Sequence, residues 1–537
     1  MRIATAQINT HTANFEQNYQ KILDYAQKAK DRHCDLVVFP ELTLFGYWPS
    51  DLLERKDLVK KQLTYINKIK KNIPSGIGVL FGAVTLNAKK SGKYYYNSAI
   101  FLEKGKRERV FTKELLPNYD VFEEVRHFEK GAIANGLLKF KGKKLLVTIC
   151  EDIWGWPESW TGTSYPENPL EKLKKLKPDF IVNLSSSPFS EGKAQRRKKV
   201  VSKTATFFKA STIYVNQVGA QDEIIFDGGS LAVDKKGKIL SNSVYFQEDI
   251  NVIDFNKNEG GIRPVLKNET QKLKEALVLG IRDYCEKNGF KKIHFGLSGG
   301  IDSALVACLA CEALGSNRVT AIALPGPYSS QKSFDLALQL AQNLNCQFLN
   351  VDINGMYRSA AEEFEISLGV KDFGFVHENL QSRLRGLTLM AYANQTNSLL
   401  LTTGNKSEYA MGYATIYGDM CGGLAPLGDL LKRQVYELSE YYNSQTEIIP
   451  NDIITRPPTA ELRENQKDED SLPPYPVLDK LVEKFIVKCD PPKNKFERDI
   501  FERMMGAEFK RWQAAPILRV SDHAFGTGRR YPITWKI

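Results

Sequence analysis

Short apolar runs alternate with longer amphipathic stretches through the first half of the chain. Residues 2–8 (RIATAQI) and 35–39 (DLVVF) are apolar enough to be buried strands. Between them Ile22, Tyr25, Ala26 and Ala29 recur at the spacing of one helical face. Further strand candidates are VLFGAVT, SAIFLE, KLLVTIC, FIVNLSS, TIYVNQVG and GSLAVD. So many strands with few helices between them predict two packed sheets flanked by helices.

The pattern changes near residues 251–264 (NVIDFNKNEGGIRP), a polar stretch with Gly and Pro that is typical of a linker. We therefore expect one domain over residues 1–250 and a second over 265–537. An amphipathic helix is predicted at about 268–287, followed by the strands KIHFGL, RVTAIALP and QFLNVDI with helices between them. This series predicts a doubly wound parallel sheet. Residues 456–476, charged and rich in proline, are expected to form a surface loop that could act as a lid.

Composition excludes some classes of protein and leaves others open. The 537 residues, of which 42% are hydrophobic, suffice for two large folded domains. We see no apolar stretch of about 20 residues and no signal peptide, so we expect a cytoplasmic protein. The eight cysteines do not suggest a disulfide framework, and the CxxC of Cys308 and Cys311 lies in an apolar helix pattern that favours core packing over metal or redox chemistry. The net charge of +11 fits either a nucleic-acid surface or the handling of phosphate-rich small molecules.

Three residues with catalytic potential follow predicted strands in the first half: Glu41 in FPELTLFGY, Lys113 in FTKELLPNYDVFEE and Cys150 in TICEDIW. Hydrolysis of an amide requires a nucleophile, a base and a positive group for the developing oxyanion. A thiol is mostly protonated at neutral pH, so a neighbouring base has to activate it. Each of these residues alone is more often structural, as a core cysteine, a surface lysine or a turn glutamate.

Taken together, the three segments resemble the nitrilase (carbon–nitrogen hydrolase) superfamily over about residues 1–250. The resemblance implies an α-β-β-α sandwich with Glu41 as general base, Lys113 in support and Cys150 as the nucleophile that forms a thioester. LPNYDVF and SSSPFSEGK are similar to the glutaminases of that superfamily. By this likeness Tyr119, Ser187, Lys193 and Glu124 would form the glutamine site, although Ser187 could be an ordinary strand-end hydroxyl and Glu124 an exposed acid.

The segment FGLSGGIDSALV, in which a Gly-rich loop joins a strand to a helix, predicts a phosphate site in the second half. Glycines let backbone N–H groups approach phosphate, and the helix N-terminus adds its positive dipole end. Asp302 is a natural Mg²⁺ ligand, because Mg²⁺ usually reaches phosphates through one or two carboxylates. The loop lacks the GK[ST] of a Walker A motif. The expected ATP-binding residues here are Gly296, Leu297, Ser298, Gly299, Gly300, Ile301, Asp302 and Ser303.

The SGGxDS pattern resembles the PP-loop ATP pyrophosphatases, which cleave ATP to AMP and pyrophosphate. HENLQSRLRG, KSEYAMGY and PPTAEL are similar to the NAD synthetases among them, over about residues 265–537. The resemblance implies that Thr403 and Lys432 contact ATP, and that Glu408 is a second Mg²⁺ ligand or a dinucleotide contact. It also places Asn379, Arg383 and Lys510 near deamido-NAD. One position departs from the pattern: Ile416 stands where ammonia-dependent synthetases carry a lysine, so that contact must be missing or supplied elsewhere.

The two resemblances together imply a glutamine-hydrolysing NAD(+) synthase. In this reading, glutamine hydrolysis at Cys150 supplies ammonia, which a protein tunnel would deliver to AMP-activated deamido-NAD. The resemblance also implies a homo-oligomer that binds small molecules and Mg²⁺, with no nucleic-acid or membrane partner. Two alternatives stay open: a PP-loop amidotransferase acting on a purine nucleotide, and an RNA-binding, tRNA-modifying protein suggested by the positive charge.

Overall fold

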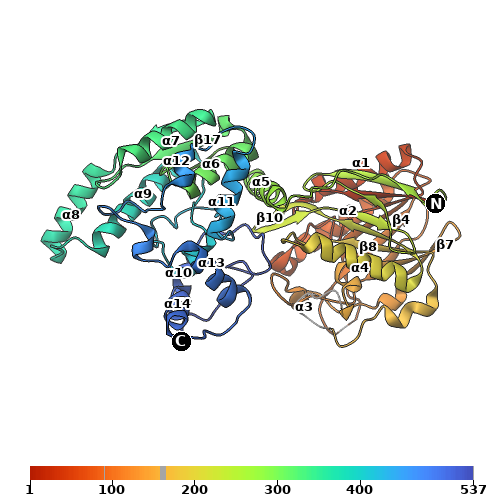
Figure 1. Cartoon of the computed structure of the whole chain (residues 1–537). Coiled ribbons are helices and arrows are strands. Elements are labelled where there is room, and N and C mark those ends of the chain that lie inside the picture. Colours follow the sequence, from red (N-terminus) through yellow and green to blue (C-terminus); the bar gives the residue numbers. More distant parts are fainter. Residues whose placement is uncertain (90, 158–164, 536–537) are drawn as a thin grey trace. The chain divides into compact units, whose positions relative to one another are not determined.

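The computed structural model describes residues 1–89, 91–157 and 165–535. The chain forms two compact units, Met1–Lys267 and Asn268–Ile537 (Figure 1). No helix in the described ranges is long and apolar enough to cross a membrane.

Two main sheets form the first unit. The seven-stranded sheet has the order β15-β14-β1-β2-β3-β4-β5, and the six-stranded sheet has the order β13-β12-β9-β8-β7-β6. The first comprises β1 (Arg2–Gln7), β2 (Leu36–Val38), β3 (Gly78–Leu86), β4 (Tyr95–Glu103), β5 (Arg109–Thr112), β14 (Asp249–Asp254) and β15 (Glu259–Gly260). The second comprises β6 (Leu137–Phe140), β7 (Lys143–Ile149), β8 (Phe180–Ser185), β9 (Ser211–Asn216), β12 (Leu231–Val233) and β13 (Ile239–Asn242). A separate hairpin joins β10 (Val218–Gln221) and β11 (Ile224–Asp227).

Apolar layers hold these sheets and their helices together. A buried cluster that includes Leu36 and Leu80 from one sheet and Val182 and Val215 from the other lies between the two sheets. Helices α1 (Phe15–Asp31) and α2 (Lys56–Asn72) pack on the seven-stranded sheet, and α4 (Lys193–Phe208) packs on the six-stranded one. Shorter helices are η1 (Ser50–Glu54), α3 (Glu124–His127), η2 (Ile133–Asn135), η3 (Cys150–Ile153) and η5 (Glu171–Leu176). The predicted α-β-β-α sandwich is confirmed.

The segment 251–264, expected as a linker, belongs instead to the first unit. Strand β14 pairs with β1 along its whole length, from Arg2 opposite Asp254 to Gln7 opposite Asp249, and β15 adds the edge strand. The polar pattern that suggested a linker is that of an edge of a sheet, where alternate side chains reach solvent. The change from one unit to the next comes later, between Lys267 and Asn268.

The second unit contains a four-stranded parallel sheet of order β18-β17-β16-β19, as predicted for a doubly wound fold. Its strands are β16 (Ile293–Gly296), β17 (Val319–Ala323), β18 (Gln347–Asn350) and β19 (Leu399–Leu400). The helices are α5 (Glu269–Lys287), α6 (Ile301–Leu314), η6 (Ser316–Arg318), α7 (Gln331–Asn343), α8 (Asn354–Leu368), α9 (Phe375–Thr396), α10 (Lys406–Met411), α11 (Lys432–Tyr442), α12 (Asn451–Thr455), η7 (Asp468–Asp470), α13 (Tyr475–Val482), η8 (Glu483–Val487), α14 (Lys495–Gly506) and α15 (Glu508–Arg511).

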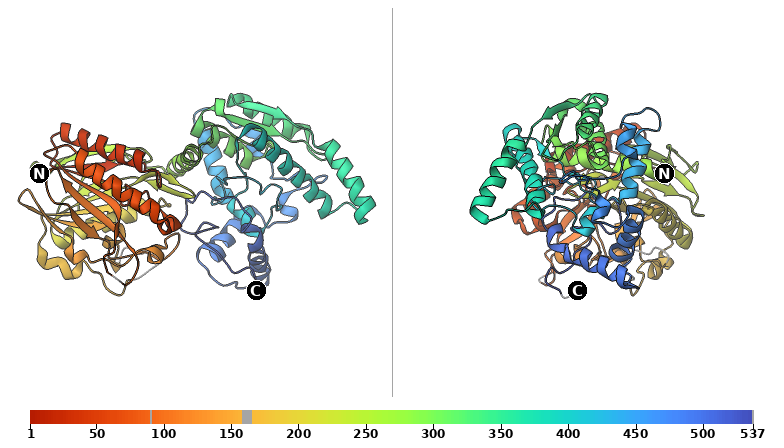
Figure 2. Two further views of the ribbon diagram at one scale, coloured as in Figure 1. Left: turned by 180° about the vertical axis from the view of Figure 1, so that it is seen from behind. Right: turned by 60° about the vertical axis from the view of Figure 1, so that its left-hand side comes forward.

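Strand order reverses between β16 and β19, and open sheets of this kind bind ligands at that point. Helices α5, α6 and α11 pack against one another, whereas α8 and α9 form a separate pair that Figure 1 and Figure 2 show side by side. A second apolar core joins α10, α13 and α14. Cys308 and Cys311 are buried along α6, in keeping with a packing role.

Candidate active sites

The three predicted catalytic residues of the first unit lie at the ends of sheet strands. Glu41 follows β2, Lys113 follows β5 and Cys150 begins η3 directly after β7. All three side chains are buried. Glu124, at the start of α3, joins them from a fourth segment. Four stretches of chain that are distant in sequence therefore meet at one place, which is how α/β folds generally build catalytic sites.

Lys113 links the two carboxylates. Its Nζ lies 2.7 Å from Glu41 Oε1 and 2.7 Å from Glu124 Oε1. Burial opposes the charge of this ammonium, but Glu124 and Glu41 outweigh burial and raise the pKa of Lys113 well above its usual value. Burial raises the pKa of Glu124 to about 7, although Lys113 opposes this shift. A permanently charged lysine between two carboxylates can both hold a base in place and face a developing oxyanion.

Three further groups fix the orientation of these carboxylates. Asn97 donates its Nδ2 to Glu41 Oε1 at 2.7 Å, and the backbone N–H of Ser186 donates to Glu41 Oε2 at 3.1 Å. The hydroxyl of Tyr47 donates to Glu124 Oε1 at 3.0 Å. Sequence analysis did not identify these partners, because each lies on a different strand or loop from the carboxylate it contacts.

Cys150 has a strained, reactive position. Its φ is +41°, in the left-handed region, on a sharp turn between strand β7 and the helix η3, and its side chain is buried. Burial and then the charge of Glu41 raise the pKa of the Cys150 thiol well above its usual value, while Lys113 lowers it. The resting residue is therefore a thiol, and nucleophilic attack has to be coupled to proton transfer to a base.

Glu151, the residue after the nucleophile, was not predicted as a site residue. Its buried carboxylate accepts hydrogen bonds from Tyr119 at 3.0 Å and from Tyr165 at 2.8 Å. The charge of Lys193 acts on the same carboxylate. The structure thus brings two of the predicted glutamine contacts, Tyr119 and Lys193, close to Glu151. A third, Ser187, follows Ser186, whose backbone N–H donates to Glu41. The signal in the sequence was the pair of acids directly after an apolar strand, in TICED.

The second unit contains a cavity of about 830 Å³ at the carboxyl end of β16. Residues of the predicted phosphate loop line it, as do Thr403, Lys432, Asn379, Glu408 and Lys510. Gly299 has φ +76°, and a Cβ there would lie 2.2 Å from the carbonyl oxygen of Ser333. The loop conformation therefore requires glycine at this position.

A second lysine–carboxylate group lies in the wall of this cavity. Lys432 Nζ is 2.5 Å from Asp302 Oδ2 and 3.7 Å from Glu408 Oε1, and Asn405 donates to Asp302 Oδ1 at 2.8 Å. Burial, and next the charge of Asp302, raise the pKa of Glu408 to about 8. Two half-buried carboxylates around one ammonium in the wall of a cavity fit a divalent cation, which would relieve the repulsion between them.

The candidate dinucleotide residues meet on one segment, residues 412–416. Lys510 Nζ donates to the carbonyls of Gly412 and Ala414 at 2.7 and 2.9 Å. Thr415 Oγ1 donates to Asn379 Oδ1 at 2.7 Å. Arg383 donates to the carbonyl of Ile416 at 3.3 Å but does not line the cavity within the described part of the chain. Ile416 packs against the apolar core. Its side chain is uncharged, so it cannot replace the contact that a lysine would make.

The expected surface loop at 456–476 closes against the phosphate loop. Arg456 donates to the carbonyl of Gly299 at 2.6 Å and to Ser333 Oγ at 2.8 Å. Glu461 accepts from Ser333 Oγ at 2.6 Å. Both residues line the cavity, together with the buried Arg385, whose pKa burial lowers to about 10. Nothing local in the sequence marked these contacts, since they join segments more than 60 residues apart.

Comparisons with known proteins show the family of each unit. Residues 2–261 match the carbon–nitrogen hydrolase family, and residues 273–514 match the NAD synthase family. Glutamine-dependent NAD(+) synthetases of Synechocystis and Thermotoga maritima are 43% and 37% identical to the chain, each alignment covering 99% of it and 98% of the relative. The structure of such a synthetase from Acinetobacter baumannii, determined with adenosine diphosphate, is 35% identical over 99% of this chain and 98% of that one, with a TM-score of 0.77. This chain belongs to the family of glutamine-dependent NAD(+) synthetases, the carbon–nitrogen ligases that carry out the last step of NAD biosynthesis.

Proposed function

We propose that the chain divides this ligase reaction between the two sites described above. Glutamine is hydrolysed around Cys150, and deamido-NAD is activated by ATP and amidated in the cavity of the second unit. The observation that carries this proposal is the pair of buried lysine–carboxylate groups, one beside a strained cysteine and the other beside a phosphate-binding loop.

In the glutaminase half, Glu41 takes the proton of the Cys150 thiol as sulfur attacks the carboxamide carbon of glutamine. Glu41 returns that proton to the leaving nitrogen, so that ammonia departs and a glutamyl thioester remains. Water, deprotonated by the same carboxylate, then releases glutamate and the thiol. The ammonium of Lys113 faces the oxyanion of each tetrahedral intermediate. Glu124, one of the expected glutamine contacts, has the role of holding Lys113.

Substrate recognition in this half uses the charges around Cys150. The buried carboxylate of Glu151, held by Tyr119, suits the α-ammonium of glutamine. Lys193 suits the α-carboxylate as a point charge, and Ser187 offers a hydroxyl beside the base. Glutamine is an amino acid with both charges, so a site with one buried anion and one cation distinguishes it from simple amides.

In the ligase half, ATP lies on the loop of residues 296–303, whose backbone N–H groups and helix N-terminus face its phosphates. Thr403 and Lys432 add further contacts. Asn379 and Lys510, which line the cavity, contact deamido-NAD, and Arg383 supports the neighbouring segment through the carbonyl of Ile416. An oxygen of the nicotinate carboxylate attacks the α-phosphorus and pyrophosphate leaves. Ammonia then attacks the activated carbonyl carbon and AMP leaves with the electron pair.

Asp302 and Glu408 would hold a Mg²⁺ ion in this cavity. The fit rests on two half-buried carboxylates that both approach Lys432 in the wall of the cavity, and on the raised pKa of Glu408. Such an ion supplies charge neutralisation for the triphosphate and for the departing pyrophosphate. Lys432, already 2.5 Å from Asp302, holds that carboxylate in place in the same wall of the cavity.

Substitution of Cys150 tests the division of labour. Cys150→Ala is expected to lose NAD formation from glutamine while keeping formation from ammonium salts at high pH. Cys34→Ala is the matched control, because Cys34 is also a buried thiol of the first unit but lies outside the site. NAD formation with each nitrogen donor gives the readout. If both donors fail equally in Cys150→Ala while the control keeps both, the two-site scheme is wrong.

Ammonia is mostly ammonium at neutral pH and is then not a nucleophile, so we propose that it passes through the protein without release. Glutamate dehydrogenase, 2-oxoglutarate and NADPH in excess consume ammonia in solution. We expect this trap to abolish synthesis from ammonium salts but to leave most synthesis from glutamine. Interception of all glutamine nitrogen by the trap would contradict transfer through the protein.

We also propose a homo-oligomer, supported by apolar side chains exposed on and beside the pair α8 and α9. Ile366, Leu368 and Leu387 are 73%, 68% and 62% exposed. Monomeric proteins rarely expose such side chains together. Light scattering after gel filtration is expected to show an assembly that Ile366→Lys combined with Leu368→Lys weakens. An unchanged mass would place the contact elsewhere.

A further inference from the structure

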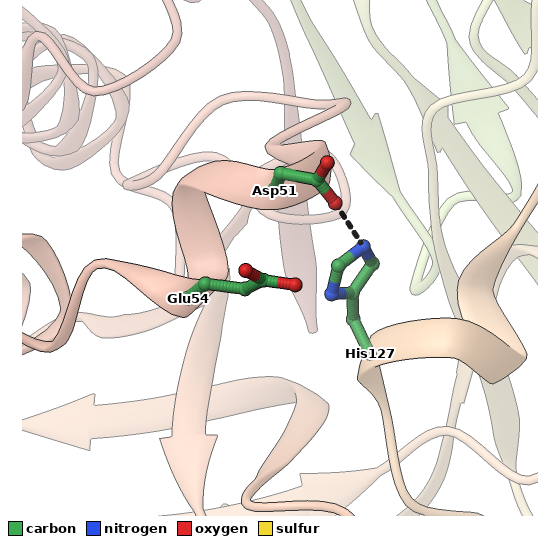
Figure 3. A group of neighbouring side chains, drawn as sticks. All are labelled: Asp51, Glu54 and His127. Atoms are coloured by element: carbon green, nitrogen blue, oxygen red, sulfur yellow. Dashed lines mark ion pairs between the residues drawn. The ribbon is translucent and has the colours of Figure 1, made fainter.

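Apart from both active sites, three potential metal ligands meet on the first unit. Asp51 and Glu54 come from η1, and His127 is the last residue of α3. Their ligand atoms all lie within 4.8 Å of one another. Figure 3 shows the imidazole of His127 pointing between the two carboxylates, with an ion-pair line to Asp51.

Local geometry explains why these three side chains converge. A 3₁₀ helix has three residues per turn, so residues 51 and 54 lie one above the other on the same face of η1. The short helix α3 packs against η1 and presents its C-terminal residue to that face. The ring of Trp48 packs edge-on against the ring of His127 at 5.9 Å and covers one side of it.

His127 provides an observation independent of the acidic pair. Its side chain is only 6% exposed, and its Nε2 accepts or donates no hydrogen bond to any described residue. A buried polar atom of this kind normally has a partner, because leaving it without one costs its desolvation. The nearest group to Nε2 is Asp51 Oδ1, 3.3 Å away. In its neutral form the imidazole has a nitrogen lone pair to offer a metal ion.

We propose that Asp51, Glu54 and His127 form a site for a divalent transition-metal ion of the Zn²⁺ class. A neutral imidazole with two carboxylates is a ligand set for Zn²⁺ or Mn²⁺, whereas Mg²⁺ and Ca²⁺ prefer oxygen ligands throughout. Metal–ligand bonds of about 2.0–2.2 Å bring donor atoms to within roughly 3–4 Å of one another, so small rotamer changes of the exposed carboxylates close the site. Water completes the coordination from the solvent side.

Arg126 is the existing partner that such an ion must displace. Its Nη2 lies 3.0 Å from Asp51 Oδ1. The two side chains are 53% and 57% exposed, and an exposed ion pair of this kind contributes little free energy. Bound metal would join η1 to α3, the helix that begins with Glu124. Binding of the ion is therefore expected to stabilise the first unit against unfolding.

The test uses the full chain, stripped of metal by a chelator that is then removed. Zn²⁺ binding is measured by equilibrium dialysis in saturating Mg²⁺, which fills sites that prefer oxygen. Wild type is compared with His127→Gln and Asp51→Asn, and Glu123→Gln is the matched control, since Glu123 is an exposed acid beside Arg126 but outside the triad. The thermal midpoint of each protein is recorded with and without Zn²⁺.

We expect wild type and Glu123→Gln to bind one Zn²⁺ more per chain than His127→Gln and Asp51→Asn, and to gain thermal stability that those two variants do not gain. Asp51 is exposed, so its variant folds even if His127→Gln is destabilised. Equal Zn²⁺ stoichiometry and affinity in wild type and Asp51→Asn would overturn the proposal. Because the readout is binding, this result is independent of the proposed synthase activity.

Discussion

Asp152 offers the sharpest test of how the glutaminase site is held together. Its buried carboxylate accepts three backbone hydrogen bonds. Oδ1 accepts from the N–H groups of Glu114 and Leu115 at 3.0 and 2.9 Å, and Oδ2 accepts from that of Ile149 at 2.9 Å. The first two N–H groups follow Lys113, and the third precedes Cys150. Asp152 therefore fastens the lysine segment to the nucleophile loop.

Asp152→Asn keeps the shape of this side chain but replaces one acceptor oxygen with a donor. The asparagine amide can be placed in two orientations. In the more favourable one its oxygen takes the position of Oδ1 and still accepts from the N–H groups of Glu114 and Leu115, and its NH₂ group faces the N–H of Ile149. One buried backbone donor then lacks an acceptor, which costs about 1–3 kcal/mol, and the two remaining bonds lose their charge assistance. We expect a loss of about 3 kcal/mol in the free energy of unfolding. A shift of about 1 Å between Lys113 and Cys150 would lower glutaminase kcat on the order of 100-fold.

Asp234→Asn is the matched control. Asp234 Oδ1 also accepts two backbone N–H groups, from Lys236 and Lys238 at 2.8 and 2.9 Å, but in a turn open to solvent. The asparagine oxygen can keep both bonds there while its NH₂ group meets water, so we expect little change. Urea unfolding and glutamate release from glutamine are the assays, with ammonium-driven synthesis as a check on the second unit. Wild-type stability and glutaminase rate in Asp152→Asn would refute the reasoning.

Three further changes concern the second unit. Lys432→Met leaves the carboxylate of Asp302, which is only 17% exposed, without its cation. We therefore expect about 3 kcal/mol less stability in urea unfolding and loss of ammonium-driven synthesis; wild-type behaviour would contradict this. Gly299→Ala forces a Cβ to 2.2 Å from a backbone oxygen, so we expect at least about 10-fold weaker binding of α,β-methylene ATP. Gly289→Ala is the control, because Gly289 also has a positive φ of +79° but has open space around it, and this variant should bind the analogue normally. The pKa of Glu408 is raised to about 8, so Glu408 is protonated in the free protein at pH 7. The folding stability that this proton contributes is lost as pH rises through about 8. Binding of the Mg²⁺ complex of the same analogue should then release a proton, seen as a buffer-dependent enthalpy in calorimetry that Glu408→Gln abolishes.

Features encoded in a short stretch of sequence could be predicted, and features that depend on distant segments could not. The strand, glycine loop and helix of residues 293–314 lie next to one another in the chain, and apolar patterning with Gly299 and Asp302 was enough to predict them. The α-β-β-α sandwich followed from many short apolar strands together with a family resemblance. Residues 251–264 were misread because the strands at this margin of the sheet, β14 and the edge strand β15, have as many polar side chains as a linker, and only their pairing with β1 and with each other distinguishes them.

The same reason explains which site residues were missed. Glu151 and Asp152 stand beside the predicted nucleophile, but their roles depend on Tyr119, Tyr165 and three backbone N–H groups that folding brings to them. Arg456 reaches Gly299 across more than 150 residues of chain. Hydrogen bonds of this kind leave no periodic pattern in the sequence, because each requires only one polar residue at one position.

The two active sites contain the same arrangement, a buried lysine between two carboxylates, yet the arrangement has different consequences in each. In the first unit Lys113 donates to Glu41 and Glu124 at 2.7 Å, and Asn97, Tyr47 and a backbone N–H occupy further lone pairs. Glu41 is thus held by three hydrogen bonds from described residues, which fix it in place and leave one lone pair on Oε2 to receive a proton, as a general base requires. In the second unit Lys432 is 3.7 Å from Glu408, and among the described residues Glu408 accepts a hydrogen bond only from its own N-cap, Asn405, at 3.2 Å. Glu408 keeps lone pairs directed at a cavity that must accept a triphosphate, so this arrangement can coordinate a cation where the first cannot. The number of hydrogen bonds that each carboxylate accepts, more than the number or charge of the carboxylates, therefore separates the proposed proton-transfer site from the proposed phosphate-activating one.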